Sequence, residues 1–286
     1  MLTEESSSRF IQAGRWRLHY HEAGSGHPVI LLHGSGPGAT GWSNFAGNIG
    51  ALAEGFRVIA PDFPGWGKSD ELDPADHSRF PANVEAITSL MDGLGIESAA
   101  LVGNSMGGIA AQMLAAEHPD RVSHCVTMGA PAPGGPQLFF APTGLTEGLK
   151  LLFAAYRDPG EESFRRLVEI MVFDPAFASD ALVRERLDNA LANPRHLEFF
   201  LKGLAGMHID AVGQDALVHA LAKSSVPALI IYGRDDRVVG VEHSLRAAAL
   251  MPSATLMVFN RCGHWAQLEH AQRFNGIVSG FLATAR

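Results

Sequence analysis

The chain has 286 residues, of which 47% are apolar and 18% are charged. This composition predicts one large globular domain, or one domain with an insertion, and excludes a disordered chain. The chain has 22 Lys and Arg and 30 Asp and Glu, which gives a formal net charge of −8, and it contains no basic run. We therefore expect no nucleic-acid partner. Apolar stretches fall short of the roughly 20 residues that cross a bilayer, which excludes a membrane partner. The N-terminus lacks the apolar segment of a signal peptide, so a cytoplasmic location is expected.

Short runs rich in β-formers recur along the chain and alternate with helical patterns. The runs are residues 16–21, 29–33, 57–62, 100–104, 124–129, 229–233 and 256–260. Several are almost continuously apolar, as expected for strands that helices cover on both faces. The alternation predicts an α/β fold with a mostly parallel central sheet.

Strand signals stop between about residues 131 and 226, where helical signals follow one another. The predicted helices are 145–156, 161–172, 180–191 and 196–204. Loop signals rich in Pro and Gly separate these helices. We interpret the segment as a helical lid inserted over the ends of the strands. The predicted division is a first core part at 1–135, the lid at 136–212 and a second core part at 213–286.

The segment Gly-Asn-Ser-Met-Gly at 103–107 joins an apolar strand to a helical pattern. This is the G-x-S-x-G spacing of a nucleophile elbow. Side chains two positions either side of Ser105 would clash in such a tight turn, so both positions are glycine. Ser105 should stand above the sheet, with the N–H of Met106 at the helix N-terminus available to an oxyanion. The plainer interpretation is a glycine-rich cap on an ordinary helix.

A serine hydroxyl is a weak nucleophile and needs a base and an orienting acid, which in this arrangement follow it in the order acid, then His. Asp236 and His264 each follow a predicted strand, at the sheet edge where α/β folds place their sites. Asp235 is the alternative acid, but the Gly-x-x-Asp spacing favours Asp236. His270 is the alternative base, but it falls on the final predicted helix.

The segment His-Gly-Ser-Gly-Pro-Gly-Ala at 33–39 follows another predicted strand and also matches a weak dinucleotide-binding fingerprint. That interpretation would use Asp62 as a ribose-binding acid. It is disfavoured because Pro37 removes an N–H from the phosphate cradle, and because the elbow, the acid and the His would have no role. We therefore expect the loop to supply a second oxyanion donor, the N–H of Ser35.

Cysteine and histidine give no metal signal. The two cysteines, Cys125 and Cys262, are too few for a disulfide scaffold and too far apart for a CxxC motif, so both should be buried as small apolar side chains. His19 and His21 share one face of a predicted strand. No further ligand residue lies near them, so we expect surface histidines rather than a metal site.

Taken together, these motifs resemble the meta-cleavage product hydrolases of the α/β-hydrolase family. The resemblance rests on residues 33–44, 64–70, 103–108, 233–237 and 262–267. It implies an α/β-hydrolase fold with a helical lid, and hydrolysis of a carbon-carbon bond in a 2-hydroxy-6-oxohexa-2,4-dienoate. After ketonisation of the dienol, Ser105 would attack the C6 ketone, giving 2-hydroxypenta-2,4-dienoate and a carboxylic acid. The resemblance implies no metal or organic cofactor, and a homodimer or higher homo-oligomer.

The same resemblance implies four residues that bind the dienoate end of the substrate. Arg186, in a lid segment similar to the family's, would bind the substrate carboxylate, together with Asn44, Asn104 and Trp265. Each has a plainer interpretation. Arg186 could be an exposed helix residue, Trp265 a packing residue, Asn104 part of the elbow turn and Asn44 a cap or turn residue.

Two other functions stay open at this point. A carboxylesterase would use the same triad without Arg186, and a ligand receptor on this fold would need no triad.

One departure from the family pattern concerns Val238, which stands where relatives often have an aromatic residue. The smaller side chain predicts extra room on the distal side of the pocket and leaves the C6 substituent open.

Overall fold

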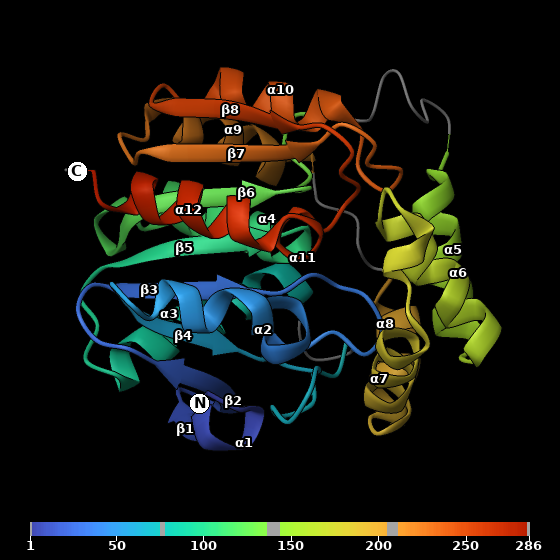
Figure 1. Cartoon of the computed structure of the whole chain (residues 1–286). Coiled ribbons are helices and arrows are strands. Elements are labelled where there is room, and N and C mark those ends of the chain that lie inside the picture. The colour runs from blue at the N-terminus through green and yellow to red at the C-terminus, as the bar shows by residue number, and fades with distance from the viewer. Residues whose placement is uncertain (1, 75–77, 136–143, 205–210, 285–286) are drawn as a thin grey trace.

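The computed structural model describes residues 2–74, 78–135, 144–204 and 211–284, in which an eight-stranded sheet runs through the centre (Figure 1). The strand order is β1-β2-β4-β3-β5-β6-β7-β8. Neighbouring strands from β4 to β8 are parallel, whereas β1 and β2 are antiparallel to their neighbours at one edge. The strands are β1 (Ser8–Ala13), β2 (Trp16–Ala23), β3 (Pro28–Leu32), β4 (Arg57–Pro61), β5 (Ala99–Asn104), β6 (Val122–Met128), β7 (Ala228–Gly233) and β8 (Ala254–Phe259).

Helices cover both faces of this sheet, which explains the apolar runs in its strands. Along β3, Val29 and Leu31 belong to one buried apolar cluster, and the intervening Ile30 belongs to the other, because successive side chains point to opposite faces. The helices outside the lid region are α1 (Glu4–Ser7), α2 (Gly41–Leu52), α3 (Arg79–Gly93), α4 (Met106–Glu117), α9 (Ala211–Lys223), α10 (Val241–Leu250), α11 (Ala266–Glu269) and α12 (Ala271–Leu282). The predicted α/β class with a mostly parallel sheet is confirmed.

Four further helices gather beside the carboxyl ends of the parallel strands (Figure 1). They are α5 (Glu147–Arg157), α6 (Glu161–Met171), α7 (Asp180–Leu191) and α8 (Pro194–Leu204), close to the predicted spans. The predicted lid start at residue 136 lies outside the described residues, and its end at 212 falls in the first turn of α9. The division into core and lid therefore stays a prediction. No helix in the described ranges is long and apolar enough to cross a membrane.

The sequence did not predict β1, and this omission made another prediction wrong. His19 and His21 are not surface residues, since each is 1% exposed. They are covered because α1 and β1 pack against β2, and two serines of that segment bind their rings. Ser8 Oγ lies 2.8 Å from His19 Nε2, and Ser7 Oγ lies 2.9 Å from His21 Nδ1. Burial lowers the pKa of His21 to about 4, so that ring is neutral at pH 7.

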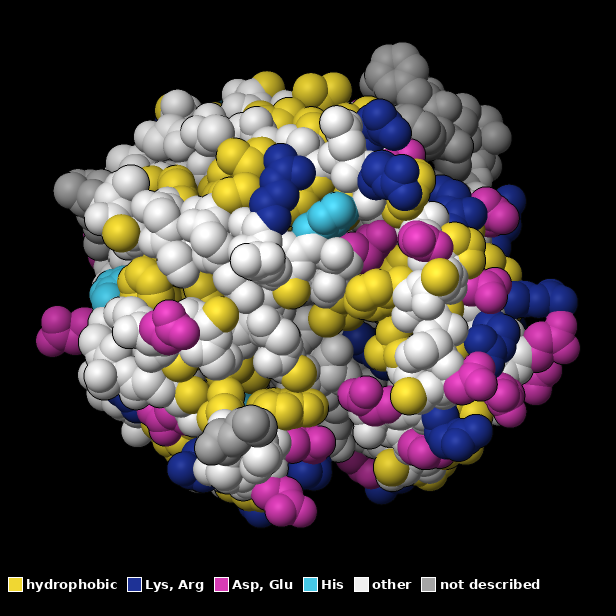
Figure 2. Space-filling view, in the orientation of Figure 1, with side chains coloured by type: hydrophobic (Ala, Val, Ile, Leu, Met, Phe, Trp, Pro, Cys, Tyr) yellow, Lys and Arg dark blue, Asp and Glu magenta, His cyan; other side chains and the backbone are white. Residues whose placement is uncertain are grey.

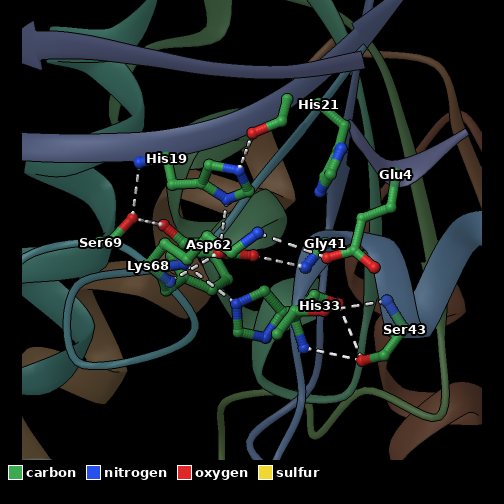
Figure 3. Close-up of polar contacts among 12 residues, drawn as sticks. Glu4, His19, His21, His33, Gly41, Ser43, Asp62, Lys68 and Ser69 are labelled. Carbon is green, nitrogen blue, oxygen red and sulfur yellow. Dashed lines mark hydrogen bonds and ion pairs between the residues drawn. The ribbon is translucent and has the colours of Figure 1, made fainter. Parts of the chain in front are cut away.

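The carboxylate of Asp62 completes this cluster and joins it to α2 (Figure 3). Its Oδ2 lies 2.8 Å from His19 Nδ1 and accepts the N–H of Lys68, while its Oδ1 accepts the N–H of Gly41 at 2.8 Å. A carboxylate with these partners is not free to bind a ribose, which removes the dinucleotide interpretation. In the described residues no cluster of His, Cys, Asp and Glu could hold a metal ion. Both cysteines are free and buried, as predicted.

Candidate active site

Ser105 occupies a strained turn between β5 and α4. Its φ of 52° and ψ of −115° lie in a region that residues with a side chain rarely adopt. A Cβ on Gly103 would lie 2.3 Å from the carbonyl oxygen of Gly107, and one on Gly107 would lie 2.1 Å from that of Leu32. Both glycines are therefore required for the close approach of α4 to β5 and β3. The turn places Ser105 on the wall of a cavity.

His264 and Asp236 form a buried pair beside the same cavity. Asp236 Oδ2 lies 2.8 Å from His264 Nδ1, and Asp236 Oδ1 accepts the backbone N–H groups of Val238 and Val239 at 2.7 and 3.0 Å. Both carboxylate oxygens of Asp236 therefore have partners. His264 Nδ1 carries the proton that is donated to Oδ2. The backbone N–H of His264 donates to the Met171 carbonyl at the end of α6, at 2.7 Å. Ser105 and His264 line one cavity.

The two alternative residues lie elsewhere. Asp235 Oδ2 accepts the N–H of Cys262 at 3.3 Å, and His270 Nε2 lies 2.8 Å from the carbonyl oxygen of Arg261. The structure thus brings Asp236, and not Asp235, to the imidazole of His264.

Gly129, at the end of β6, is a residue whose importance sequence reasoning missed. Its φ is +54°, and a Cβ there would lie 2.7 Å from His264 Nδ1 and 3.2 Å from Asp236 Oδ2. A side chain at this position would therefore displace the pair. The signal in the sequence was a glycine directly at the end of a predicted strand, the edge at which α/β sites lie.

The loop after β3 is held in place by His33, which is fully buried. Its Nδ1 donates to the carbonyl of Gly34 at 2.8 Å, and its Nε2 accepts the N–H of Phe63 at 3.0 Å. The Gly34 carbonyl and the Ser35 N–H belong to one peptide unit, so His33 orients that N–H. Burial lowers the pKa of His33 to about 4, and the neutral ring can both donate and accept. Met106 is the first residue of α4, where N–H groups have no partner within the helix.

Tyr156 of α5 contacts this loop and is itself bound by His196 of α8, and the sequence pointed to neither residue. The Tyr156 hydroxyl donates to the carbonyl of Ser35 at 2.7 Å, and this hydroxyl oxygen lies 2.9 Å from His196 Nε2 of α8. Burial raises the pKa of Tyr156 and lowers that of His196 well below its usual value. Both groups are therefore neutral at pH 7, and hydrogen bonds link α8 through α5 to the loop. No motif in the sequence signals a contact between residues so far apart.

Arg186 is buried against the cavity rather than exposed on α7, since it is 3% exposed. One terminal nitrogen donates to the Ser43 carbonyl at 2.9 Å, and the guanidinium lies over the Trp265 ring, 4.7 Å from its centroid. Burial lowers its pKa to about 10, so it remains a cation at pH 7. A desolvated cation stacked on an aromatic ring is placed to receive an anion.

Three polar atoms of cavity-lining residues have no hydrogen-bond partner in the described part of the chain. They are Arg186 Nε, Asn44 Oδ1 and Asn104 Oδ1. The amide nitrogen of Asn104 does have partners, the carbonyls of Met128 and His264, so this residue also shapes the elbow. Buried polar atoms are normally paired, so these atoms indicate where a polar ligand would bind.

The space between these residues, counted together with the solvent at its mouth, is about 420 Å³. Its lid side is apolar and is formed by Leu152 of α5 and by Leu167, Val168 and Met171 of α6. Val238 does not line it. A Cβ on Gly148 would lie 2.6 Å from Val238 Cγ2, so α5 packs directly against this valine. The extra room predicted beside Val238 is therefore filled by α5.

Comparison with known proteins places the chain in a family. Residues 27–271 match the model of the α/β-hydrolase fold. The chain is 44% identical to a 2-hydroxy-6-oxononadienedioate/2-hydroxy-6-oxononatrienedioate hydrolase of Burkholderia vietnamiensis, covering 98% of this chain and 97% of the relative. It is 42% identical to a 2-hydroxy-6-oxo-6-phenylhexa-2,4-dienoate hydrolase of Burkholderia cepacia, covering 99% and 98%. The chain belongs to the meta-cleavage product hydrolases.

Solved structures of this family superpose over nearly the whole chain. The 2-hydroxy-6-oxo-6-phenylhexa-2,4-dienoate hydrolase of a Rhodococcus species gives a TM-score of 0.85 at 31% identity, covering 97% of this chain and 98% of the other. A meta-cleavage product hydrolase of Pseudomonas fluorescens gives 0.83 at 34% identity, covering 96% of each chain. The resemblance inferred from the five sequence segments is confirmed.

Proposed function

We propose that this chain hydrolyses the bond between C5 and C6 of a 2-hydroxy-6-oxohexa-2,4-dienoate. The observation that carries the proposal is one cavity lined by Ser105 on its strained turn, by His264 paired with Asp236, and by a buried arginine, Arg186. The first three groups suit acyl transfer, and the arginine suits a substrate that carries a carboxylate. The relatives bear names of this reaction class.

In the proposed reaction, the dienol first ketonises, which places a proton on C5. His264 then accepts the Ser105 proton as Oγ attacks the C6 ketone, and Asp236 stabilises the imidazolium. The N–H groups of Ser35 and Met106 bind the oxyanion. The C5–C6 bond breaks with its electron pair moving toward the dienoate, which takes a proton and leaves as 2-hydroxypenta-2,4-dienoate. Water, deprotonated by His264, releases the carboxylic acid from Ser105.

Arg186 is proposed to bind the C1 carboxylate, and Asn44, Asn104 and Trp265 to hold the dienoate beside it. The unpaired Oδ1 atoms of both asparagines line the cavity and accept hydrogen bonds, which suits the 2-hydroxyl group. Trp265 supports the guanidinium through its ring face. Each step is assigned to groups of the chain itself, so the proposal uses no cofactor and no metal.

The carboxylesterase alternative uses the same triad but gives Arg186 no role. Arg186 lines the cavity with its Nε unpaired among the described residues, a position that suits a carboxylate ligand and favours the dienoate. The test is an assay of wild type and Arg186→Gln on 2-hydroxy-6-oxo-6-phenylhexa-2,4-dienoate, followed by loss of its yellow colour, beside p-nitrophenyl acetate. We expect a large loss on the dienoate and little change on the ester. Equal losses would assign Arg186 a structural role.

Two further expectations rest on the resemblance and stay predictions. A homodimer or higher homo-oligomer is expected, and light scattering on a sizing column measures it. A cytoplasmic location is expected and can be tested by fractionation of the source cell.

A further inference from the structure

We infer that the cavity accepts dienoates whose C6 substituent is uncharged and apolar, and that it discriminates against dienedioates. This inference rests on the proposed function and specifies its substrate class. It departs from the names of several relatives at 42–44% identity, which are hydrolases of 2-hydroxy-6-oxononadienedioate. That compound carries a second carboxylate, at the end of a two-carbon chain on C6.

Positive charge is scarce among the described residues that line the cavity. Among its described lining residues, Arg186 is the single Lys or Arg. Every substrate of the proposed class brings a C1 carboxylate, which occupies this guanidinium. A second carboxylate would therefore enter without a cationic partner, and burying an unpaired carboxylate is strongly unfavourable.

The residues outside the described ranges do not change this count. Apart from Arg286 at the chain end, they contain no Lys or Arg. Residues 136–143 read Pro-Gln-Leu-Phe-Phe-Ala-Pro-Thr, and residues 205–210 contain one imidazole, His208, and one acid, Asp210. Wherever these segments lie, they bring no guanidinium or ammonium group to the cavity.

α6 presents its apolar side chains to the cavity. Leu167, Val168 and Met171 line the cavity and are at most 3% exposed. The cations of the same helix, Arg165 and Arg166, pair with acids on the outer face. Figure 2 shows charged side chains of both signs over this side of the molecule. The lid therefore presents apolar side chains inward and its charges outward.

Among the described residues, a second arginine, Arg79, is also buried. Arg79 of α3 is 6% exposed, and its guanidinium lies 4.6 Å from the Trp66 ring centroid and 5.1 Å from that of Phe200. Its Nη1 has no hydrogen-bond partner among the described residues, but the side chain does not line the cavity. As a second buried arginine, Arg79 is the alternative partner for a second carboxylate that the test includes.

The test compares kcat/KM of the wild type on 2-hydroxy-6-oxo-6-phenylhexa-2,4-dienoate and on 2-hydroxy-6-oxononadienedioate. We expect the phenyl substrate to be favoured by about 100-fold or more, the cost of an unpaired buried carboxylate. Values within about 5-fold of each other, or a preference for the dienedioate, overturn the inference while leaving the proposed function intact. A failure to cleave either dienoate overturns the proposed function itself.

Two variants sharpen this comparison. Val168→Arg places a cation on the apolar wall and should shift the ratio toward the dienedioate by at least about 10-fold, whereas the neutral control Val168→Met should not. Turnover of p-nitrophenyl acetate and circular dichroism confirm that both variants are folded. If the wild type does cleave the dienedioate, Arg79→Met decides why. Loss of activity on that substrate alone would make Arg79 the second carboxylate site and contradict the inference.

Discussion

Two buried His–Asp pairs among the described residues have the same Nδ1–Oδ2 distance of 2.8 Å, and both lie at a pocket. Only the pocket beside His264 is also lined by a serine on a strained turn and by a buried arginine. His19 and Asp62 even have a serine on the other ring nitrogen, because Ser8 Oγ lies 2.8 Å from His19 Nε2. Ser8 has an ordinary extended backbone with φ −65°, whereas Ser105 is held at φ 52°. A serine, a histidine and an aspartate joined by hydrogen bonds therefore do not by themselves make an active site.

The two pairs differ in the groups that their carboxylates bind and in what surrounds the imidazole. Asp62 also fixes the N–H of Gly41, the first residue of α2, so the His19 pair joins the edge of the sheet to the helix that carries Asn44. Apart from the His264 ring, the printed partners of Asp236 are N–H groups of its own loop, and the imidazole borders an apolar cavity with a buried arginine. The first pair stabilises the fold, and the second is proposed to act on substrate.

The largest expected effect is on turnover at the second pair. Ser105→Ala, His264→Ala and Asp236→Asn should each lower kcat by about 1,000-fold or more, and double variants should lose little beyond the singles, because triad members act as one unit. Ser8→Ala should keep kcat within about 3-fold. Steady-state kinetics on the phenyl dienoate measures both. A severe Ser8→Ala defect in a folded protein would refute the distinction.

The next effect is on stability at the first pair. Asp62→Asn leaves His19 and two backbone N–H groups without their carboxylate, so the free energy of unfolding should fall by about 3 to 5 kcal/mol. Asp236→Asn is the matched control and should cost less than about 1.5 kcal/mol, because both of its N–H partners bind Oδ1, which the amide keeps. In Asp62 each oxygen accepts one backbone N–H, so the NH2 group of an asparagine would face one of them. Urea unfolding measures both. Equal losses would mean that the two pairs contribute equally to stability.

Acid should destabilise the fold through the buried neutral His33. Its pKa is about 4 in the folded chain against about 6.5 unfolded, so the unfolded state binds more protons between these values. The stability is fully present above pH 6.5 and is lost as the pH falls toward 4, by about 3 kcal/mol. Asp62 acts in the same direction, because the hydrogen bond with His19 holds its pKa below the usual value against the opposing effect of burial.

Urea titrations at pH 7 and pH 4.5 test this, with His33→Gln as the variant and the exposed His118→Gln as the control. His33→Gln should reduce the pH dependence but not abolish it, because buried His21 also has a pKa of about 4, whereas His118→Gln should follow the wild type. Parallel curves for all three proteins would show that His33 is not the titrating group.

Arg186 comes next. Loss of a charge-assisted hydrogen bond of roughly 1.5 to 3 kcal/mol predicts a fall in kcat/KM of about 10- to 150-fold on the dienoate for Arg186→Gln. The arginine should also stabilise charge that spreads toward C1 during ketonisation, so kcat should fall while KM rises. Stopped-flow spectra separate ketonisation from cleavage. An unchanged ketonisation rate would restrict Arg186 to binding.

The smallest expected effect concerns the lid contact with the loop after β3. Tyr156→Phe removes the hydrogen bond to the Ser35 carbonyl, worth about 0.5 to 1.5 kcal/mol, so kcat should fall by about 2- to 10-fold. The loss should be similar on the dienoate and on p-nitrophenyl acetate, because both need the same oxyanion site. A loss confined to the dienoate would place Tyr156 at the substrate instead.

The sequence predicted the parts of this molecule that depend on local signals. The elbow at 103–107 requires two glycines at fixed spacing, and apolar runs such as 229–232 identify buried strands directly. The burial of His19 could not be predicted, because it depends on β1, a short edge strand whose polar residues give no strand pattern. The contact between Tyr156 and Ser35 joins residues 121 positions apart. The filling of the space beside Val238 likewise depends on where α5 packs.

The most direct test of the account is product analysis with one substrate and two serine variants. The phenyl dienoate is mixed with wild type, Ser105→Ala and Ser8→Ala, and the products are separated by liquid chromatography with mass detection. The account predicts equal amounts of benzoate and 2-hydroxypenta-2,4-dienoate from wild type and Ser8→Ala, and uncleaved dienoate with Ser105→Ala. Cleavage that persists undiminished in Ser105→Ala, or a wild type that leaves the dienoate intact while hydrolysing p-nitrophenyl acetate, would contradict it.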